Sequence, residues 1–228
     1  MTRQWVLIDA DDTLWENNIY FEQAFDEFVQ LLDHPRLSPA RVREVLDSIE
    51  IENIRVNGYG AQNFGRNMQQ CFRLLVERPY TDEDERAVMQ VADRIAGRPM
   101  KIFDGIEETL AYLAERHHVT LCSKGHPEEQ NQKIDRSGLR RHFDGCHVVR
   151  EKDVATYRGL VEQTGMEPGK TWMVGNSPRS DINPALAAGL GAVLVSNPNT
   201  WSLEQEEIPP PSRRFVVVSA FRDLRELF

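Results

Sequence analysis

Short apolar, β-branched runs alternate with segments of helical period along much of the chain, and this alternation restricts the possible folds most. The runs are nearly continuous in apolar residues, as is typical of strands that helices cover on both faces. The predicted strands are residues 5–10, 119–123, 147–149, 171–175, 192–196 and 215–219. The helices predicted between the later strands are residues 105–117, 127–137, 153–164 and 184–189. This order predicts an α/β protein with a doubly wound parallel sheet.

One long stretch interrupts the alternation, because residues 17–98 contain no convincing strand. Apolar residues recur there at helical spacing, as in Phe21, Phe25 and Phe28, which favours an antiparallel helical bundle. Ser38 and Thr81 are predicted N-caps, the latter followed by an acidic first turn. The four helices drawn from this pattern are residues 19–32, 38–55, 61–78 and 81–96. We therefore predict a core formed by residues 1–16 and 99–228, with residues 17–98 inserted as a helical domain.

Composition and charge exclude several classes of function. The chain has 228 residues, and its 27 basic against 36 acidic residues give a net charge of −9, which argues against nucleic-acid binding. No apolar run approaches the ~18 residues of a membrane span, and the acidic start is unlike a signal peptide. The 3 cysteines, Cys71, Cys122 and Cys146, lack the spacing of a zinc site or a disulfide framework. We expect a cytoplasmic protein that does not bind membranes.

Three acidic residues follow the first predicted strand. Asp9, Asp11 and Asp12 stand within the sequence Asp-Ala-Asp-Asp-Thr-Leu. The carboxyl ends of strands in open α/β sheets are where ligands bind. Like charges repel, so such a cluster must be hydrated, paired or bound to a metal ion. We interpret the cluster as a catalytic site rather than as an ordinary turn or helix N-cap.

These residues resemble the first motif, DxDx[TV], of the haloacid dehalogenase superfamily of phosphohydrolases. The later motifs follow in the expected order. Ser123 ends the second strand, where the family has a Ser or Thr, and Lys152 precedes a helical segment, where the family has a lysine. Residues 175–181 resemble the last motif, GDxxxxD. The insertion at 17–98 matches the α-helical cap of this family, so the resemblance covers nearly the whole chain and implies a Rossmann-like core.

The resemblance implies a phosphatase that acts on a small soluble phosphomonoester through an aspartyl-phosphate. Asp9 would be the nucleophile, and Asp11 would protonate the leaving alcohol and then deprotonate the attacking water. Mg²⁺ would be held by the Asp9 side chain, the Asp11 backbone carbonyl, Asn176 and Asp181. Oxygen ligands suit this hard cation. The pattern does not distinguish a monomer from a homodimer.

Further residues are implied in phosphate and substrate binding. Ser123 would position the phosphoryl group and Lys152 would neutralise its charge, although Ser123 also fits an ordinary strand-end hydroxyl and Lys124 and Arg150 are nearby cations. The helical domain would close over the site and determine specificity. A turn at 57–63 either faces substrate or only joins two helices. The predicted substrate-binding residues are Asp12, Thr13, Ser123, Lys124, Asn17, Asn18 and Tyr59.

Two positions depart from the family pattern. Asn176 stands where the family has Asp, which removes one negative charge from the metal site while leaving a neutral oxygen. Asp12 replaces a glycine that many relatives carry. The first motif in this form resembles the pyrimidine 5′-nucleotidase and phosphoglycolate phosphatase-like branch.

Other readings of the same motifs stay open. A carbon–halogen hydrolase would use the same nucleophile but has no need of Asp11 or of a metal ion. A phosphoryl mutase of the same fold would carry Glu-Asp where this chain has Gly175 and Asn176. A non-catalytic binding or regulatory protein would keep the fold, and Asn176 is the feature that supports it.

Overall fold

The computed structural model describes residues 2–228, which divide into two compact units. The first, which we call the α/β unit, contains the chain up to Glu16 together with Met100–Phe228. The second, the helical unit, is Asn17–Pro99. Each unit buries an apolar cluster of its own.

A six-stranded parallel sheet forms the centre of the α/β unit, in the order β3-β2-β1-β4-β5-β6. The predicted doubly wound α/β fold is therefore confirmed. Since all strands run in one direction, their carboxyl ends share one edge, and the strand order reverses beside β1. The strands are β1 (Trp5–Ile8), β2 (His118–Lys124), β3 (Gly145–Val149), β4 (Thr171–Gly175), β5 (Gly191–Val195) and β6 (Phe215–Val218).

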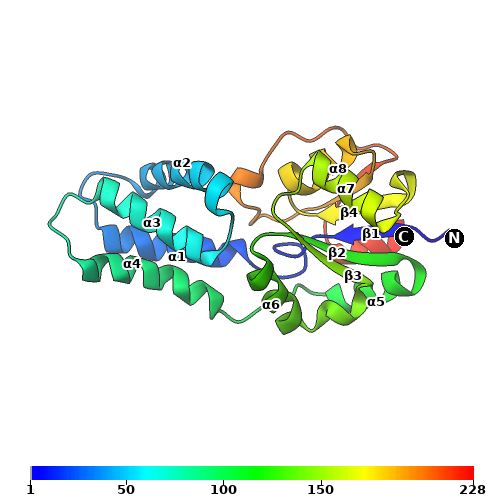
Figure 1. Ribbon diagram of the computed structural model, residues 1–228, viewed down its shortest axis with the longest axis horizontal. Helices are drawn as coiled ribbons and strands as arrows, with labels where there is room; N and C mark the ends of the chain where they lie inside the picture. Colours follow the sequence, from blue (N-terminus) through cyan, green and yellow to red (C-terminus); the bar gives the residue numbers. More distant parts are fainter. Residues whose placement is uncertain (1) are drawn as a thin grey trace. The chain divides into compact units, whose positions relative to one another are not determined.

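Helices cover both faces of this sheet. Figure 1 shows α7 and α8 on one face and α5 and α6 on the other. Alternate residues of β1 point to opposite faces, so Val6 and Ile8 join one apolar cluster while Leu7 joins another. Apolar residues are therefore needed at every position of the inner strands. The helices are α5 (Ile106–Arg116), α6 (Pro127–Ser137), α7 (Val154–Thr164), α8 (Asn183–Ala187) and α9 (Leu224–Leu227).

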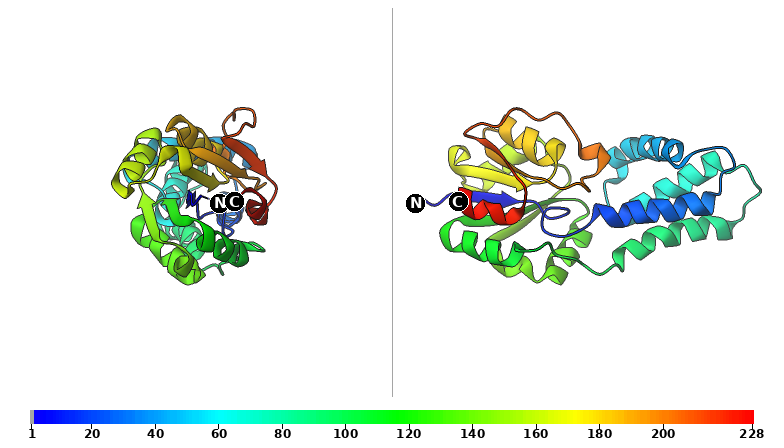
Figure 2. Two further views of the ribbon diagram at one scale, coloured as in Figure 1. Left: turned by 90° about the vertical axis from the view of Figure 1, so that its right-hand side faces the viewer. Right: turned by 180° about the vertical axis from the view of Figure 1, so that it is seen from behind.

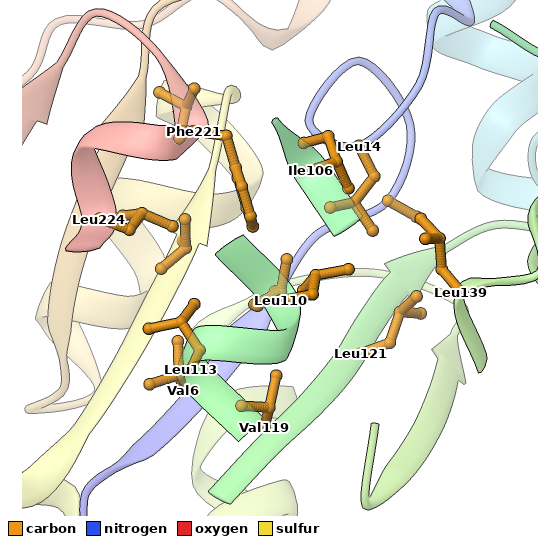
Figure 3. Packing of buried hydrophobic residues seen from close by; sticks show 14 of the residues in the cluster. Val6, Leu14, Ile106, Leu110, Leu113, Val119, Leu121, Leu139, Phe221 and Leu224 are labelled. Carbon is orange, nitrogen blue, oxygen red and sulfur yellow. The ribbon is translucent and has the colours of Figure 1, made fainter. Parts of the chain in front are cut away.

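The face that carries α5 holds the larger cluster. Leu110 and Leu113, three residues apart on α5, lie against Val6 and Val119 of the sheet (Figure 3). Both leucines are fully buried. Burying a side chain of this size stabilises the fold by about 1.5–3 kcal/mol. Figure 2 shows α9 beside α5, where it extends the same apolar layer.

The two segments that connect the units pair with each other inside the α/β unit. The Glu16 amide donates a hydrogen bond to the Lys101 carbonyl (2.9 Å), and the Phe103 amide donates to the Leu14 carbonyl (3.0 Å). Trp15, which lies between Leu14 and Glu16 in the sequence, is only 1% exposed. The chain that follows β1 is thus fixed to the chain that returns from the helical unit.

Four helices make up the helical unit. Phe25 and Phe28 are buried in its core, and Phe21 packs edge-on against Phe64 with the ring centroids 5.2 Å apart. The helices lie lengthwise beside one another in Figure 2. They are α1 (Asn18–Leu32), α2 (Pro39–Asn57), α3 (Ala61–Leu75) and α4 (Asp82–Ala96).

Two of these helices begin at the predicted caps. The Ser38 hydroxyl accepts a hydrogen bond from the Arg41 amide (3.3 Å) before α2. The Thr81 hydroxyl accepts from the Glu83 amide (3.3 Å), and the Asp84 carboxylate accepts from the Thr81 amide (2.8 Å). Each contact pairs an amide that the first turn of a helix leaves unpaired.

The segment predicted as a helix at 184–189 differs from the prediction. A single π-helical turn, Pro178–Ile182, comes first and leads into α8. The Ser177 carbonyl accepts from the amides of both Asp181 (2.9 Å) and Ile182 (3.2 Å). Such widened turns are frequent at functional sites, and apolar periodicity does not reveal them.

Among residues 2–228, no helix is both long and apolar enough to span a bilayer.

Glu50 of α2 is an acid buried within the helical unit. Its side chain is 5% exposed, and its Oε2 has no hydrogen-bond partner. Burial raises the pKa of Glu50 to about 8; the charges of Asp47 and Glu22 add to the increase and Arg43 opposes it. The folded state therefore favours the neutral carboxylic acid at this position.

We predict that the free energy of unfolding falls as the pH rises from about 5 to about 8. The unfolded carboxyl ionises near pH ~4.3, whereas the folded Glu50 keeps its proton up to about pH 8. The folded state binds more protons in this range, so raising the pH favours unfolding. Glu50→Gln cannot ionise and should reduce the pH dependence. Thermal unfolding at both ends of the range, followed by circular dichroism, measures the effect.

Glu52→Gln is the matched control, because Glu52 is an exposed glutamate two residues further along α2. This variant should keep the pH dependence of the wild type. If Glu50→Gln loses stability between the two pH values as steeply as Glu52→Gln, the buried carboxyl is not the cause.

Candidate active site

Buried polar side chains follow the carboxyl ends of neighbouring strands. Asp9 follows β1, Ser123 lies near the end of β2, Lys152 follows β3, and Asn176 follows β4. Each is at most 7% exposed. In an open parallel sheet, ligands bind where the strand order reverses, which here is beside β1 and β4. The structure therefore brings residues distant in sequence to the edge where a ligand is expected.

The loop after β1 turns sharply and directs Thr13 back toward the strand. Asp12 adopts a left-handed conformation with φ of 59°, which Asp tolerates better than most residues. Asn197, after β5, donates from its Nδ2 to the Asp12 carbonyl (2.6 Å). The Thr13 hydroxyl lies 2.9 Å from Asp9 Oδ2.

Asp9 is bound at both of its oxygens. Lys152 Nζ donates to Oδ1 at 2.5 Å, and the Thr13 hydroxyl donates to Oδ2. Burial raises the pKa of Asp9 to about 7, against the opposing charge of Lys152, and the charge of Asp181 adds to the increase. A carboxylate with so little water around it is oriented and poorly solvated, as an attacking group should be.

Lys152 lies between two carboxylates. Its Nζ also donates to Asp181 Oδ1 at 2.7 Å, and its side chain is 2% exposed. Burial alone would lower the pKa of Lys152, but Asp181 and Asp9 together raise it, so the side chain stays an ammonium ion. The Ser177 amide donates to Asp181 Oδ2 (3.0 Å). At Gly175, a Cβ atom would lie 2.1 Å from that oxygen, so the position requires glycine.

Asp11 has a different set of partners. Its carboxylate accepts from Trp15 Nε1 (2.8 Å), from Gln130 Nε2 (2.9 Å) and from Lys133 Nζ (3.0 Å and 2.9 Å). Burial would raise the pKa of Asp11, but Lys133 and the hydrogen bonds from Gln130 and Trp15 lower it below the usual value. The environments of Asp9 and Asp11 thus shift their pKa values in opposite directions, and Asp11 is the group that ionises more readily.

The oxygens available to a cation come from Asp9 and Asn176. The Thr13 hydroxyl lies 2.9 Å from Asp9 Oδ2 and 3.1 Å from Asn176 Oδ1, so both oxygens are within reach of one atom. Asn176 Nδ2 donates to the Thr200 hydroxyl (2.9 Å), which orients the amide oxygen toward Thr13. Among residues 2–228, no group of three or more His, Cys, Asp or Glu side chains could hold a metal ion. The donors are the Asp9 carboxylate, the Asn176 amide oxygen and, as the first motif implies, the Asp11 backbone carbonyl. This set fits a cation that prefers oxygen ligands.

Lys124, predicted to bind substrate, contacts two other segments of the α/β unit, and its contact with substrate stays a prediction. Its Nζ donates to Glu204 Oε1 (2.5 Å) and to the Ser180 hydroxyl (2.8 Å). The Ser177 hydroxyl donates to the other oxygen of Glu204. These contacts fasten residues 202–204 to the turn after β4, and it is Lys152 rather than Lys124 that contacts Asp9.

The other predicted substrate-binding residues belong to the helical unit. Asn17 and Asn18 stand at the start of α1, and Tyr59 lies in the turn between α2 and α3. Gly58, with φ of 72°, makes that turn possible. Substrate contact by these three residues stays a prediction.

Sequence reasoning missed several residues that contact the site. Gln130 and Lys133 lie three residues apart on α6 and both bind Asp11. Residues three apart lie on the same face of a helix, and the helix predicted at 127–137 directly follows the strand that ends at Ser123. The sequence therefore contained a signal that these two side chains face the site. Glu204 ends the short 3₁₀ turn Ser202–Glu204, and Thr200 lies in the irregular chain before it; no sequence pattern predicts their contacts.

Comparisons with known proteins identify the family and the fold of the chain. Over 130 residues the chain is 30% identical to the phosphoserine phosphatase of Thermus thermophilus, an aligned region that covers 53% of this chain. The same region covers 49% of the phosphatase, so the chain spans about half the length of that relative.

Solved structures show the same fold. A haloacid dehalogenase-like family hydrolase from Xanthomonas campestris is 26% identical, with a TM-score of 0.85 over 99% of this chain and 94% of that one. The L-2-haloacid dehalogenase of Xanthobacter autotrophicus superimposes with a TM-score of 0.65 over 99% and 98% of the two chains; at 18% identity this likeness concerns the fold alone.

A family model described as haloacid dehalogenase-like hydrolase matches residues 4–189. The match includes the loop after β1, the helical unit and the turn after β4, which confirms at family level the resemblance seen in the motifs. The chain therefore belongs to the haloacid dehalogenase-like hydrolase family.

Proposed function

We propose that the protein is a phosphoric monoester hydrolase that acts on a small phosphomonoester through an aspartyl-phosphate intermediate. The observation that carries this proposal is the second carboxylate, Asp11, which is held by hydrogen bonds near the nucleophile candidate Asp9. The phosphoserine phosphatase from Thermus thermophilus, a partial relative, supports the same class of reaction.

The chemistry of the leaving group separates this proposal from carbon–halogen hydrolysis. A halide ion departs without a proton, so a dehalogenase needs a nucleophile but no acid for the leaving group. An alcohol leaves a phosphate ester readily only if its oxygen gains a proton as the P–O bond breaks. A second carboxylate beside the nucleophile therefore favours a phosphate ester as substrate.

In the first step, an oxygen of the Asp9 carboxylate bonds to phosphorus while the bond from phosphorus to the alcohol oxygen breaks. Asp11, whose acid form is the minor one because Lys133 lowers its pKa, gives a proton to that oxygen from this form and becomes a carboxylate. The products of this step are the free alcohol and a phosphoryl group on Asp9.

In the second step, the Asp11 carboxylate takes a proton from a water molecule whose oxygen attacks phosphorus. The bond from phosphorus to Asp9 breaks, phosphate departs, and Asp11 ends in the acid form for the next cycle. One residue thus serves both half-reactions, because the proton that it takes from water in the second step replaces the proton that it gave to the alcohol in the first.

Ser123 and Lys152 would bind the phosphoryl oxygens. The Ser123 hydroxyl is buried at the end of β2, and the Lys152 ammonium already neutralises Asp9. Mg²⁺, held by Asp9, Asn176 and the Asp11 carbonyl, would lower the repulsion between the nucleophile and the phosphate dianion. Asp181, also predicted as a metal ligand, contacts Lys152 directly and would act through it, and its part in holding the ion stays a prediction.

We predict that the wild-type protein hydrolyses p-nitrophenyl phosphate when Mg²⁺ is added, and that a chelator stops the reaction. Asp9→Asn removes the attacking oxygen anion and should lower kcat by about 10³-fold or more. Release of nitrophenolate, measured by absorbance, follows the reaction.

Two controls accompany this measurement. Circular dichroism establishes that Asp9→Asn is folded, and 2-chloropropionate tests the dehalogenase alternative by release of chloride. Chloride release without hydrolysis of any phosphate ester would overturn the proposed function. Turnover of neither class of substrate would favour a binding protein.

Asn176→Asp should lower the Mg²⁺ concentration that gives half-maximal activity, by about fivefold or more, because an anionic ligand replaces a neutral one. Titration of activity with Mg²⁺ measures this change. Gln163→Glu is the control, because it adds the same charge at an exposed position of α7. An unchanged Mg²⁺ requirement in Asn176→Asp would remove residue 176 from the metal site.

A further inference from the structure

The Asp11 carboxylate is held mainly by a helix rather than by its own loop. Lys133 Nζ lies 3.0 Å from Oδ1 and 2.9 Å from Oδ2, and Gln130 Nε2 lies 2.9 Å from Oδ2. Trp15 supplies the remaining donor, to Oδ1. Both oxygens of the carboxylate are therefore oriented by fixed donors.

The local structure of α6 presents these donors on one face. Gln130 and Lys133 are three residues apart, so they are neighbours on the helix surface. Gly125, with φ of 145°, precedes the helix, and a Cβ atom there would lie 3.1 Å from the Gln130 side chain. Glycine at this position leaves the room that the glutamine occupies.

Gln130 also joins two parts of the site. The same Nε2 lies 2.5 Å from the Ser123 hydroxyl and 3.2 Å from the Lys124 carbonyl. The side chain is 3% exposed, so water does not compete strongly for these contacts. One amide thus fixes the separation between the Asp11 carboxylate and the hydroxyl at the end of β2.

The cations of the site are divided between the carboxylates. Lys152 pairs with Asp9 and Asp181, whereas Lys133 pairs with Asp11. Lys133 thereby offsets the repulsion between Asp11 and Asp9 without contacting the nucleophile candidate. Its side chain is 18% exposed, so the pair is largely removed from solvent.

We propose that Lys133 and Gln130 are positioning residues that hold the Asp11 carboxylate for proton transfer with the leaving group. The inference rests on the proposed function and deepens it, since it assigns to α6 the orientation of the proton-transfer group. Lys133 acts through Asp11, whereas Gln130 contacts both Asp11 and the Ser123 hydroxyl.

Leaving-group dependence of kcat/KM tests this role, because kcat/KM reports the steps up to departure of the alcohol. The substrates are p-nitrophenyl phosphate, phenyl phosphate and glycerol 2-phosphate. Their leaving alcohols become less acidic in this order, so departure depends more and more on proton transfer to the leaving oxygen. Lys133→Met should lower kcat/KM for glycerol 2-phosphate by about 10²-fold, the usual size of a general acid's contribution. It should lower kcat/KM for p-nitrophenyl phosphate only by about threefold, since nitrophenolate departs without a proton.

Three comparisons make the measurement specific. Lys170→Met removes an exposed lysine paired with Glu167 and should leave all three values unchanged. Lys133→Arg keeps the charge and should recover most of the glycerol 2-phosphate activity. In an Asp11→Asn background, Lys133→Met should add no further leaving-group dependence, because its target is already absent. Gln130→Met should show the same leaving-group dependence together with a loss common to all three esters, because it also releases the Ser123 hydroxyl.

The outcomes separate the inference from the proposed function. If the wild type turns over no phosphate ester, the proposed function fails and the inference fails with it. If the wild type is active and folded Lys133→Met lowers kcat/KM equally for all three esters, only the positioning role is overturned. A leaving-group effect that persists in the Asp11→Asn background would also overturn it.

Discussion

The ammonium group of Lys152, buried between Asp9 and Asp181, is the interaction on which the arrangement of the site depends. It joins the chain after β1, the chain after β3 and the π-helical turn after β4, three segments that the sheet alone brings only near one another. Removing one partner of a buried ion pair costs about 3–5 kcal/mol, because the remaining charge is left without compensation. The requirement for glycine at 175 follows from the same contact, since Asp181 reaches Lys152 across that residue.

A second consequence is that the acidic residues of the first loop take different roles although they are two residues apart. The pKa of Asp9 is raised, chiefly by burial, while Lys133 with its neighbouring donors lowers the pKa of Asp11. Burial that Lys152 does not fully offset at Asp9, and the donors of Lys133 and its neighbours at Asp11, produce this difference, which the sequence Asp-Ala-Asp alone does not reveal. Placing Lys133 on α6, away from Lys152, prevents the two carboxylates from competing for one positive charge.

The sequence predicts most of the sheet, because apolar residues on both faces of a buried strand leave a continuous run such as 171–175. It also predicts which residues stand at the carboxyl edge, since Asp9, Ser123 and Asn176 directly follow or end such runs. It could not predict that Lys124 pairs with Glu204, because that partner is far away in the sequence. Nor could it predict the π-helical turn, whose extra residue depends on tertiary contacts rather than on periodicity.

The pairing of the two connecting segments has a mechanical consequence. Residues 14–16 and 101–103 form a short ribbon through which the chain passes to and from the helical unit. Trp15 belongs to that ribbon and donates directly to Asp11, whereas Asp9 is anchored to the sheet through Lys152. The ribbon is therefore linked to the Asp11 carboxylate through the indole N–H of Trp15, and to the Asp9 carboxylate through the hydroxyl of Thr13, the residue before the ribbon. Both acids of the first loop are thus coupled to the chain that enters and leaves the helical unit, Asp11 directly and Asp9 through one further side chain.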